Sequence, residues 1–511
     1  MPPFESKEFM HFSISAPAAA PRVSLPVSAR IASRLTREFF GVLLLVAIAG
    51  CRGQQADPNA TADLTKAVYA APGGWSGGDG TKDHPFDLAS ALSGKSPIRP
   101  GGTVWLRAGT FKGSFTSLLT GTAEAPITVR PVPGEHVAID GAGVVGAVLT
   151  INGAWTVIRD FEIMDSDLQR TGADLNRAAG VDVHAPNSKV VNLVIHDLGS
   201  GIGMWSDAVD TEAYGNIIYY NGWVGTDRAH GHGIYTQNKT GTRRITDNVI
   251  FSQFGIGLHA YGSEEAFLDD IQVEGNAVFN NGITGGDFNI LLGGHRIANR
   301  PVLISNFTYD QPGAGNNLGY AAGCTDLRMK DNYFAALKGG YSIQLVNCTG
   351  DLQGNTLVGN TRGISGQTIV THPELAAKYP NNSFIDPPAT GAKIFVRPNR
   401  YTPGRANIIV YNWGHTKDVR VDVSAAGIPV GGSYEIRDVR NLSGDPVASG
   451  TYAGSPVKIP MQGLTAQPVV GWPQTPPHTA PEFGAFLLTS STETPSAFGR
   501  MTARLRGMIG L

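Results

Sequence analysis

Gly275-Asn276-Ala277-Val278-Phe279 is one of seven similar segments in the middle of the chain that together decide the fold. In each segment an asparagine precedes a short, mostly apolar run, and nearly every asparagine follows a turn-prone residue. Successive asparagines are 24, 32, 28, 30, 26 and 23 residues apart, at Asn192, Asn216, Asn248, Asn276, Asn306, Asn332 and Asn355. A repeat of this length built from short strands predicts a solenoid, because one rung cannot bury its own apolar face and must stack on the next.

We expect these asparagines to occupy the same turn in successive rungs. Asparagine suits such a turn because it tolerates left-handed backbone angles. When the rungs stack, each side-chain amide can hydrogen-bond with the asparagine above and the one below. Asparagine is also common in ordinary loops, but seven copies before apolar runs favour a ladder.

The composition also predicts an all-β protein. The chain has 511 residues, with 65 Gly, 32 Pro and only 16% charged residues, which is typical of many turns and few amphipathic helices. The length exceeds that of one ordinary domain. The formal net charge of −2 is balanced, and it points away from nucleic acid and from an anionic membrane surface as partners. We expect a monomer.

Residues 1–50 have the features of an export signal. Arginines precede an apolar run at residues 39–50, which is short for a membrane span. The segment Ile48-Ala49-Gly50-Cys51 resembles the processing site of a bacterial lipoprotein signal. The resemblance implies that Cys51 becomes the lipid-bearing first residue and that residues 51–67 form a tether. The protein would then be an exported lipoprotein, held at the outer membrane or cell surface; an ordinary signal peptide with an incidental cysteine is the alternative.

Two further cysteines, Cys324 and Cys348, are 24 residues apart, which is one repeat. Each lies seven or eight residues before an asparagine of the series, so we expect them on neighbouring rungs, about 4.8 Å apart. This spacing is within Cα range for a disulfide, and export would permit one. Two stacked thiols in the core are the other interpretation, and the sequence does not choose between them.

The chain before the repeats opens with Tyr69-Ala70-Ala71-Pro72-Gly73-Gly74, and Asp87 can cap a short helix that ends at Leu92. This opening and the rungs that follow, residues 68–370, resemble the right-handed parallel β-helix proteins of the pectate lyase-like superfamily. The resemblance implies three parallel sheets and a ligand bound along one outer face.

The pattern changes after residue 370. Residues 371–392 contain several prolines and read as a linker. Residues 393–490 contain short alternating strands, which predict a small antiparallel β-sandwich. We expect this domain to act as a cap rather than as a carbohydrate-binding module. Residues 491–511 form a tail.

Aligning the strands by their glycine-rich starts predicts two outward columns on one sheet. The first column contains Asp182, Gly203, Tyr235, Gly257 and Leu291. The second contains His184, Trp205, Gln237, His259 and Gly293. Aromatic rings can stack on the faces of pyranose sugars, and the polar groups beside them can bind hydroxyls. A lone histidine is more often structural, but the cluster favours a site.

We therefore predict that His232, Tyr235 and His259 are catalytic. The residues predicted to bind substrate are Asp182, His184, Trp205, Asp207, His230, Gln237, Asn238, Lys239, Tyr261 and Asn289. Nearby, Arg228 and Arg296 are also candidates to hold a carboxylate. The metal ligands are unknown, and Ca²⁺ is left open as a cofactor, because no dense cluster of acidic residues is visible.

The segment Gly231-His232-Gly233 resembles the Gly-His-Gly of polygalacturonase-type hydrolases. Those enzymes also need paired carboxylates, and the matching positions here hold none; the substitutes are only Asp182, Asp207, Asp210 and Asp227. A polysaccharide lyase can instead use imidazole and phenol groups as base and acid. We therefore favour a lyase. A hydrolase or uronan C5-epimerase on the same face, and a surface β-helix that only binds glycans, are the alternatives.

Overall fold

The computed structural model describes residues 63–490, apart from 173–174, 176, 311–312 and 338. The described residues lie in the second of two units, which begins at Thr61. The predicted signal peptide, Cys51, most of the tether and the tail at 491–511 lie outside them. Among the helices that can be described, none is long and apolar enough to cross a membrane.

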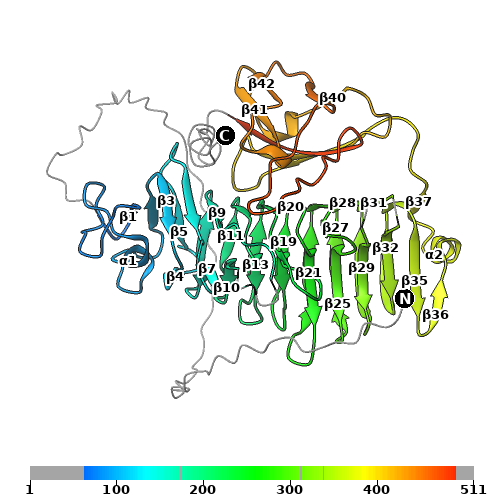
Figure 1. Cartoon of the computed structure of the whole chain (residues 1–511), viewed down its shortest axis with the longest axis horizontal. Coiled ribbons are helices and arrows are strands. Elements are labelled where there is room, and N and C mark those ends of the chain that lie inside the picture. The colour runs from blue at the N-terminus through cyan, green and yellow to red at the C-terminus, as the bar shows by residue number, and fades with distance from the viewer. Residues whose placement is uncertain (1–62, 173–174, 176, 311–312, 338, 491–511) are drawn as a thin grey trace, which may run out of the picture. The chain divides into compact units, whose positions relative to one another are not determined.

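Three long sheets of parallel strands form a right-handed β-helix, as predicted (Figure 1). The first sheet contains β1 (Ala67–Ala70), β2 (Thr103–Leu106), β5 (Ile127–Pro131), β8 (Thr156–Arg159), β11 (Lys189–Val191), β14 (Glu212–Tyr214), β19 (Arg243–Thr246), β22 (Leu268–Asp269), β23 (Ile271–Glu274), β26 (Ala298–Asn299), β27 (Val302–Ile304), β30 (Cys324–Lys330) and β33 (Cys348–Gln353). The second contains β3 (Gly109–Lys112), β6 (Val137–Asp140), β9 (Glu162–Met164), β12 (Val194–His196), β15 (Ile217–Tyr219), β20 (Val249–Phe251), β24 (Ala277–Phe279), β28 (Phe307–Asp310), β31 (Tyr333–Ala336), β34 (Thr356–Gly359) and β37 (Ser383–Ile385).

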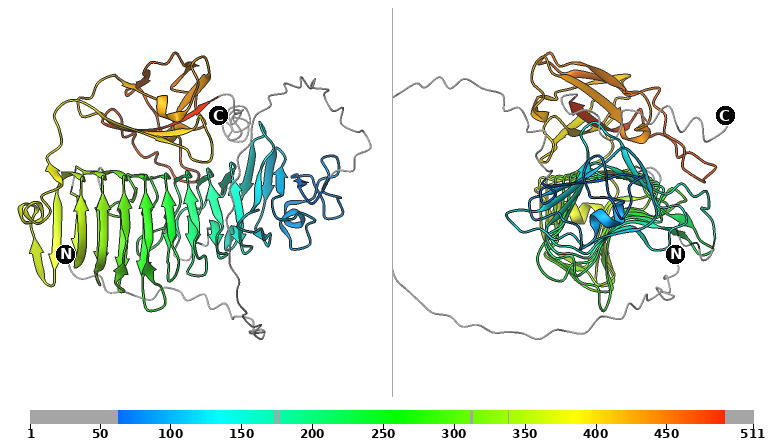
Figure 2. Two further views of the ribbon diagram at one scale, coloured as in Figure 1. Left: turned by 180° about the vertical axis from the view of Figure 1, so that it is seen from behind. Right: turned by 90° about the vertical axis from the view of Figure 1, so that its left-hand side faces the viewer.

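The third sheet carries the predicted site. Its strands are β4 (Phe115–Ser117), β7 (Ala147–Ile151), β10 (Ala179–Val183), β13 (Ser200–Met204), β18 (His232–Thr236), β21 (Ile256–Gly262), β25 (Phe288–Gly294), β29 (Gly315–Tyr320), β32 (Tyr341–Val346), β35 (Thr361–Ser365) and the antiparallel β36 (Thr368–Val370). The view along the stack in Figure 2 shows the strands arranged around a common interior. Buried side chains of all three sheets, such as Ile202, Ile245 and Ile250, fill it.

The asparagine ladder is present, with two corrections. Each amide from Asn216 to Asn355 donates to the carboxamide oxygen on the next rung; between Asn276 and Asn306 this distance is 3.0 Å. Asn192 is not a member, since the backbone N–H of Leu193 donates to Asn216 at the ladder position. The ladder instead ends at Asn382, which the repeat spacing did not identify.

The left-handed backbone belongs to the residue before each ladder asparagine from Asn216 to Asn355. Gly215, Asp247 and Gly275 have φ values of 66°, 53° and 70°. The turn-prone residues noticed in the sequence supply the unusual conformation, and the asparagines supply the hydrogen bonds. The predicted left-handed backbone is therefore wrong for the six ladder asparagines of the series, and right only for Asn192, which has a φ of 56° and is not a ladder member.

Short helices lie at both ends of the β-helix. Asp87 caps α1 (Leu88–Leu92) by accepting from the Ser90 N–H at 2.7 Å, as predicted, and Leu88 and Leu92 are buried in the core. At the other end, α2 (His372–Lys378) buries Leu375 in the same core. The predicted linker 371–392 therefore contains α2 and β37, and the boundary predicted at residue 370 is too early.

The C-terminal segment forms an antiparallel sheet, as predicted. It contains β38 (Lys393–Pro398), β39 (Ala406–Tyr411), β41 (Ser433–Asp438), β42 (Ala448–Thr451) and β44 (Phe483–Ser490). A pair, β40 (Asp418–Val421) and β43 (Val457–Pro460), and the turns η1 (Ser424–Ala426) and η2 (Val439–Asn441) accompany it. Apolar side chains of both sheets form one cluster.

This domain covers the outer face of the second sheet. Tyr309 of β28 stacks on Phe483 with ring centroids 4.8 Å apart. The Tyr411 hydroxyl donates to the Thr308 carbonyl at 2.9 Å, and the Trp413 indole donates to the Tyr333 hydroxyl at 3.0 Å. The domain is thus a cover for one sheet, while α2 closes the end of the β-helix.

The first sheet decides between a disulfide and two free thiols for the cysteine pair. Cys324 and Cys348 are partners in the β30–β33 register and are joined by a disulfide, with Cα atoms 4.4 Å apart.

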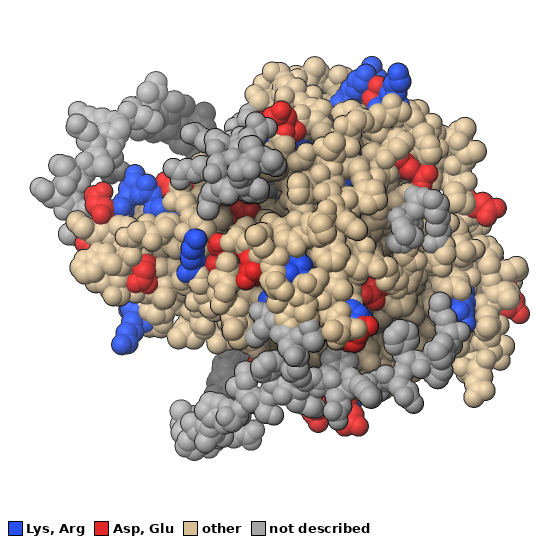
Figure 3. All heavy atoms as spheres, in the orientation of Figure 1, with Lys and Arg blue, Asp and Glu red and all other residues tan. Residues whose placement is uncertain are grey.

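The surface charge is mixed. On the face in Figure 3, basic and acidic side chains are scattered rather than gathered in one patch.

Replacing Asn276 by Ala should test the ladder. The change leaves the buried amides of Asn248 and the carbonyl of Ile245 without their partner, because Asn276 bonds to both. We expect a loss of roughly 2–5 kcal/mol of unfolding free energy, measured by urea denaturation. Asn360→Ala, at an exposed position, is the control. Equal unfolding free energies of the two variants would contradict a stabilising role of the ladder hydrogen bonds.

Candidate functional site

The predicted outward columns exist on the third sheet, but one register is shifted. Tyr235 lies opposite His259, and Ile234 lies opposite Leu258. The sequence alignment had placed Tyr235 opposite Gly257. The shift is two residues, so the same side chains still face outward, but they meet different neighbours. The ambiguity arose because Gly255 and Gly257 alternate with apolar residues, and either can be matched to Gly233.

A column of glycines decides this register. A Cβ on Gly201, Gly233 or Gly257 would lie 2.3–2.6 Å from the carbonyl oxygen of the next rung, so the rungs can approach closely only if these residues are glycine. The column ends at Asn289, which is fully buried. It places Tyr235 and His259 side by side.

His232, Tyr235 and His259, the three residues predicted to be catalytic, form a compact group. The ring centroids of His232 and His259 are 4.5 Å apart, and Nε2 of His232 lies 3.4 Å from Nδ1 of His259. The Tyr235 ring is 5.7 Å from His232 and 5.5 Å from His259. Nδ1 of His232 is buried and has no hydrogen-bond partner in the described structure. We call these three residues the histidine–tyrosine centre.

Burial sets the charge states of this centre. It lowers the pKa of His232 to about 3, and the charges of Arg228 and His230 act in the same direction. Burial, His232 and Arg228 also hold the pKa of His259 well below its usual range. Burial raises the pKa of Tyr235. Both imidazoles are therefore neutral at neutral pH, while the phenol keeps its proton.

Gln237 orients the phenol. Its Nε2 donates to the Tyr235 hydroxyl oxygen at 2.9 Å. Since that oxygen already accepts a hydrogen bond, its own proton is available to another acceptor. Gln237, which was predicted to bind substrate, thus holds Tyr235 in the structure.

The earlier rungs extend the aromatic face. Trp205 lies 5.6 Å from Tyr235 between ring centroids and is stacked with His184 at 6.1 Å. Nδ1 of His184 is 3.1 Å from Asp207, and this contact raises the pKa of His184. Burial raises the pKa of Asp182, while Trp205 and His184 partly offset the effect. The structure therefore groups these four predicted residues beside the centre.

Later rungs continue the same face. The ring centroid of Tyr261 is 5.3 Å from His259 and 6.0 Å from both His295 and Tyr320. Tyr320 was missed, because it ends β29, a strand that the sequence alignment did not include. From His184 to Tyr320 the rings span six rungs, about 24 Å at ~4.8 Å per strand. An extended polymer could lie along this row.

A small hairpin borders the centre. It consists of β16 (Trp223–Val224) and β17 (Ala229–His230). The ring of His230 stacks on Trp223 at 4.8 Å, and its Nε2 lies 2.8 Å from Asp227. Both partners tie His230 to the hairpin, so its predicted substrate role is less direct. Arg228, between the strands, supplies the positive charge that acts on both histidines.

Asp287 is a further carboxyl group that the sequence reasoning missed. It precedes β25, after Gly285 and Gly286. Burial raises its pKa, and the charges of Arg228 and His230 oppose the rise. A glycine pair directly before an acidic residue and a strand was the signal that could have identified it.

Two predicted substrate-binding residues are structural instead. Asn289 belongs to a second amide ladder, in which Asn281 Nδ2 donates to Asn289 Oδ1 at 2.9 Å. Asn238 is fully buried, and its amide donates to the carbonyls of Gly241 and Asp269. Each lies at a strand or turn position where its side-chain amide bonds to buried backbone or amide groups, and strand alternation alone does not predict such bonds.

The carboxylates considered as hydrolase substitutes are also mostly engaged. Asp210 accepts from the Thr242 N–H at 2.8 Å, and Asp227 is bound to His230. Within the described ranges, no group of three or more His, Cys, Asp or Glu side chains is arranged to hold a metal ion. The geometry thus offers imidazole, phenol and guanidinium groups rather than a pair of carboxylates.

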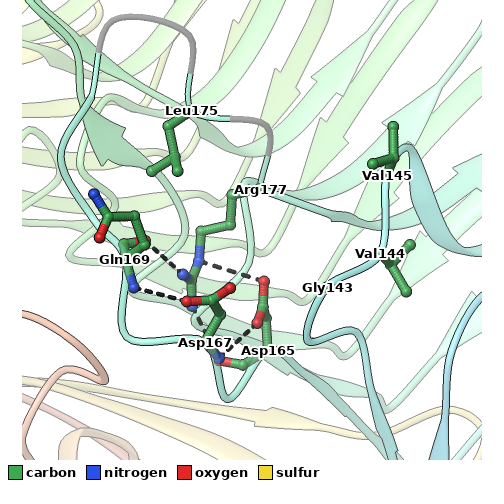
Figure 4. Close-up of a pocket in the computed structure, with 8 residues that line it drawn as sticks. All are labelled: Gly143, Val144, Val145, Asp165, Asp167, Gln169, Leu175 and Arg177. Atoms are coloured by element: carbon green, nitrogen blue, oxygen red, sulfur yellow. Dashed lines mark hydrogen bonds and ion pairs between the residues drawn. The ribbon is translucent and has the colours of Figure 1, made fainter.

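A separate pocket of about 90 Å³ lies on earlier rungs. Figure 4 shows the Arg177 side chain directed toward Asp165 and Gln169. Its Nη1 donates to the Gln169 carbonyl at 2.8 Å and its Nε to the Asp197 carbonyl at 2.8 Å. The guanidinium is therefore occupied by the protein itself, and the pocket is part of the packing around it.

Comparison with models of protein families and with curated proteins gives no match. Among solved structures, similar chains include a pectate lyase (15% identity, 63% of this chain and 82% of that chain, TM-score 0.38) and a rhamnogalacturonan lyase (14%, 63% and 84%, TM-score 0.43). A lacto-N-biosidase from Eubacterium ramulus is also similar (13%, 63% and 67%, TM-score 0.38). At these values the similarity carries no argument about function, and the fold rests on the strand pairing.

The neutral state of His232 should appear in the pH dependence of stability. Its pKa falls from 6.5 to about 3 on folding, so the unfolded chain binds more protons between these values. The contribution of His232 to stability is complete above about pH 6.5 and is lost as the pH falls toward 3. We expect the melting temperature of the parent to fall between about pH 7 and pH 4, and that of His232→Gln to fall less over the same range. Calorimetry at several pH values measures both. His84→Gln, at an exposed site, should behave like the parent; identical curves for all three proteins would contradict the buried neutral state.

Proposed function

We propose that this protein is a carbohydrate-active enzyme that cleaves a polysaccharide by lyase chemistry on the outer face of the third sheet. The observation that carries the proposal is the grouping of His232, His259 and Tyr235, whose ring centroids lie 4.5–5.7 Å apart. Burial lowers the pKa of both histidines and raises that of the phenol, which favours two neutral imidazoles beside a protonated phenol. Elimination needs one group that takes a proton and another that gives one, and this centre contains both at neutral pH.

His259 is the base in this proposal. If its Nδ1–H donates to Nε2 of His232, 3.4 Å away, its own Nε2 holds a lone pair. His232 then carries its proton on Nδ1 and acts by orienting His259. The buried Nδ1 of His232 has no acceptor in the described structure, and this costs free energy that a purely structural pair would not need.

Tyr235 is the acid. The Nε2 of His259 takes the proton from C5 of a uronate, and electrons of that C–H bond form the C4–C5 double bond. The C4–O4 bond breaks, and the leaving oxygen takes the phenol proton of Tyr235. Return of the proton from His259 to Tyr235, directly or through water, restores both groups. The raised pKa of the phenol favours its protonated starting state.

Arg228 is suited to hold the uronate carboxylate. Its charge acts on both histidines, and its ion pair with Asp227 is loose, at 3.7 Å between exposed side chains. A substrate carboxylate paired with Arg228 would make the proton on C5 more acidic. Its negative charge would also offset the repulsion between Arg228 and a protonated His259.

A C5-epimerase on the same face would use the same base but return a proton to C5 without breaking the C4–O4 bond. A hydrolase would need acidic carboxyls, and the raised pKa values of Asp182 and Asp287 are what favours that alternative. A β-helix that only binds glycans would need the rings and no proton transfer. Export, the lipid on Cys51 and a monomeric state stay predictions from the sequence, which leaves Ca²⁺ open as a cofactor.

Turnover of uronate polymers tests the reaction. A lyase produces the ultraviolet absorbance of an unsaturated uronate; reducing ends without that absorbance indicate a hydrolase, and binding without either indicates a glycan-binding protein. We expect Tyr235→Phe and His259→Ala to lower kcat by roughly 10²–10⁴-fold, the usual effect of removing a general acid or base. His84→Ala is the matched control. Activity unchanged in both site variants, with intact folding by circular dichroism, would sink the assignment.

Arg228→Gln tests the carboxylate contact. Losing one charge-assisted hydrogen bond should reduce kcat/KM on an acidic polymer by roughly tenfold or more. Arg420→Gln, at an exposed position of the C-terminal domain, removes the same charge away from the site. Steady-state kinetics of the two variants should therefore differ, and equal values would argue against a role for Arg228.

A further inference from the structure

A second group of rings lies beyond the histidine–tyrosine centre, with two cations beside it. Tyr261 of β21, His295 after β25 and Tyr320 of β29 have ring centroids 6.0–6.3 Å apart. Each comes from a different rung of the third sheet. We call these three residues the distal ring cluster. Its far member, Tyr320, is two rungs from His259, about 10 Å at ~4.8 Å per strand.

The two cations are held over a single ring. The Arg296 guanidinium carbon lies 3.5 Å from the centroid of Phe267, and the Lys239 ammonium lies 4.6 Å from it. Nη1 of Arg296 also donates to the Glu264 carbonyl at 2.7 Å, which fixes the guanidinium against the loop that carries Phe267. Arg296 directly follows His295, and its Cβ lies 3.1 Å from where a Cβ on Gly262, the residue after Tyr261, would be. The chain that carries Arg296 therefore borders the distal ring cluster, and Phe267 holds Lys239 next to Arg296. Cation–π contacts place charge without neutralising it.

Neither cation has a carboxylate partner. In the part of the chain that the structure describes, no ion pair involves Arg296 or Lys239, although the exposed Glu264 and Glu265 lie in the adjacent loop. By contrast Arg300, only four residues later, forms an ion pair with Asp270 at 2.7 Å. Two positioned cations without a protein anion can bind one from a ligand.

We propose that the distal ring cluster with Arg296 and Lys239 is a second subsite, which binds another acidic sugar of the same polymer. This inference rests on the proposed function, because it assumes that a polysaccharide lies along the third sheet. The rings stack on the apolar faces of the sugar, and the two cations bind its carboxylate. The subsite therefore selects an acidic polymer over a neutral one, away from the bond that is broken.

Binding measured without turnover tests the subsite. The full-length chain with Tyr235→Phe serves as the parent, and calorimetric titration compares oligogalacturonate and oligomannuronate with a neutral cello-oligosaccharide of equal length. We expect the parent to bind at least one acidic probe more tightly than the neutral one. Arg296→Gln or Lys239→Gln should weaken acidic binding by roughly tenfold and leave neutral binding unchanged.

Two controls separate charge from structure. Arg296→Lys keeps the charge and should keep the preference for the acidic probe, while Arg300→Gln removes a charge outside the subsite and should bind like the parent. Melting temperatures within a few degrees of the parent show that the variants fold.

Two results would overturn the inference: parent-like affinity for acidic probes in both Gln variants, or no binding of either acidic probe by the parent. The outcome is independent of the reaction. If the wild-type protein forms no unsaturated product but the charge-dependent binding is found, the lyase proposal fails and the subsite stands. If product forms and the Gln variants bind normally, the reverse holds.

Discussion

The rungs from Asn216 to Asn382 depend on the hydrogen bonding of buried amides between neighbouring rungs. A ladder asparagine such as Asn276 donates to the next rung and accepts from the previous one, with no water to replace either partner. An amide that slipped by one residue would leave several buried groups unsatisfied, so the ladder sets where each turn begins. The apolar strands that follow are then stacked in step, and their alternate side chains form a continuous core.

The ladder controls the second sheet directly, but the third sheet needs a further constraint. That constraint is the close approach of the backbone at Gly201, Gly233 and Gly257, where a side chain would collide with the next rung. It brings Tyr235 level with His259 and leaves the outward direction of both unchanged. The arrangement of the site is thus a consequence of a steric limit near the start of the strands β13, β18 and β21 that carry it.

Burial then gives the site its chemical character. The same desolvation that lowers the pKa of the two histidines raises that of Tyr235, because both effects disfavour the charged form. A nearby arginine strengthens the effect on the imidazoles. The result is a neutral base beside a neutral acid on the outer face of the third sheet. The contacts of the C-terminal domain described above are with the second sheet.

The repeat of asparagine before apolar runs was enough to predict a solenoid of short strands, because periodicity is a local property of the chain. The right-handed parallel β-helix was what the resemblance of residues 68–370 to the pectate lyase-like superfamily implied. The outward direction of His184, Trp205, Tyr235 and His259 was also predictable, since it follows from strand alternation. Tertiary structure alone decided which of these side chains meet, because a two-residue register shift preserves alternation and changes every neighbour. It also decided that Asn238 and Asn289 satisfy buried backbone and amide groups, and that Asp287 and Tyr320 join the face. These roles depend on burial and on contacts between distant segments, which a linear pattern does not contain.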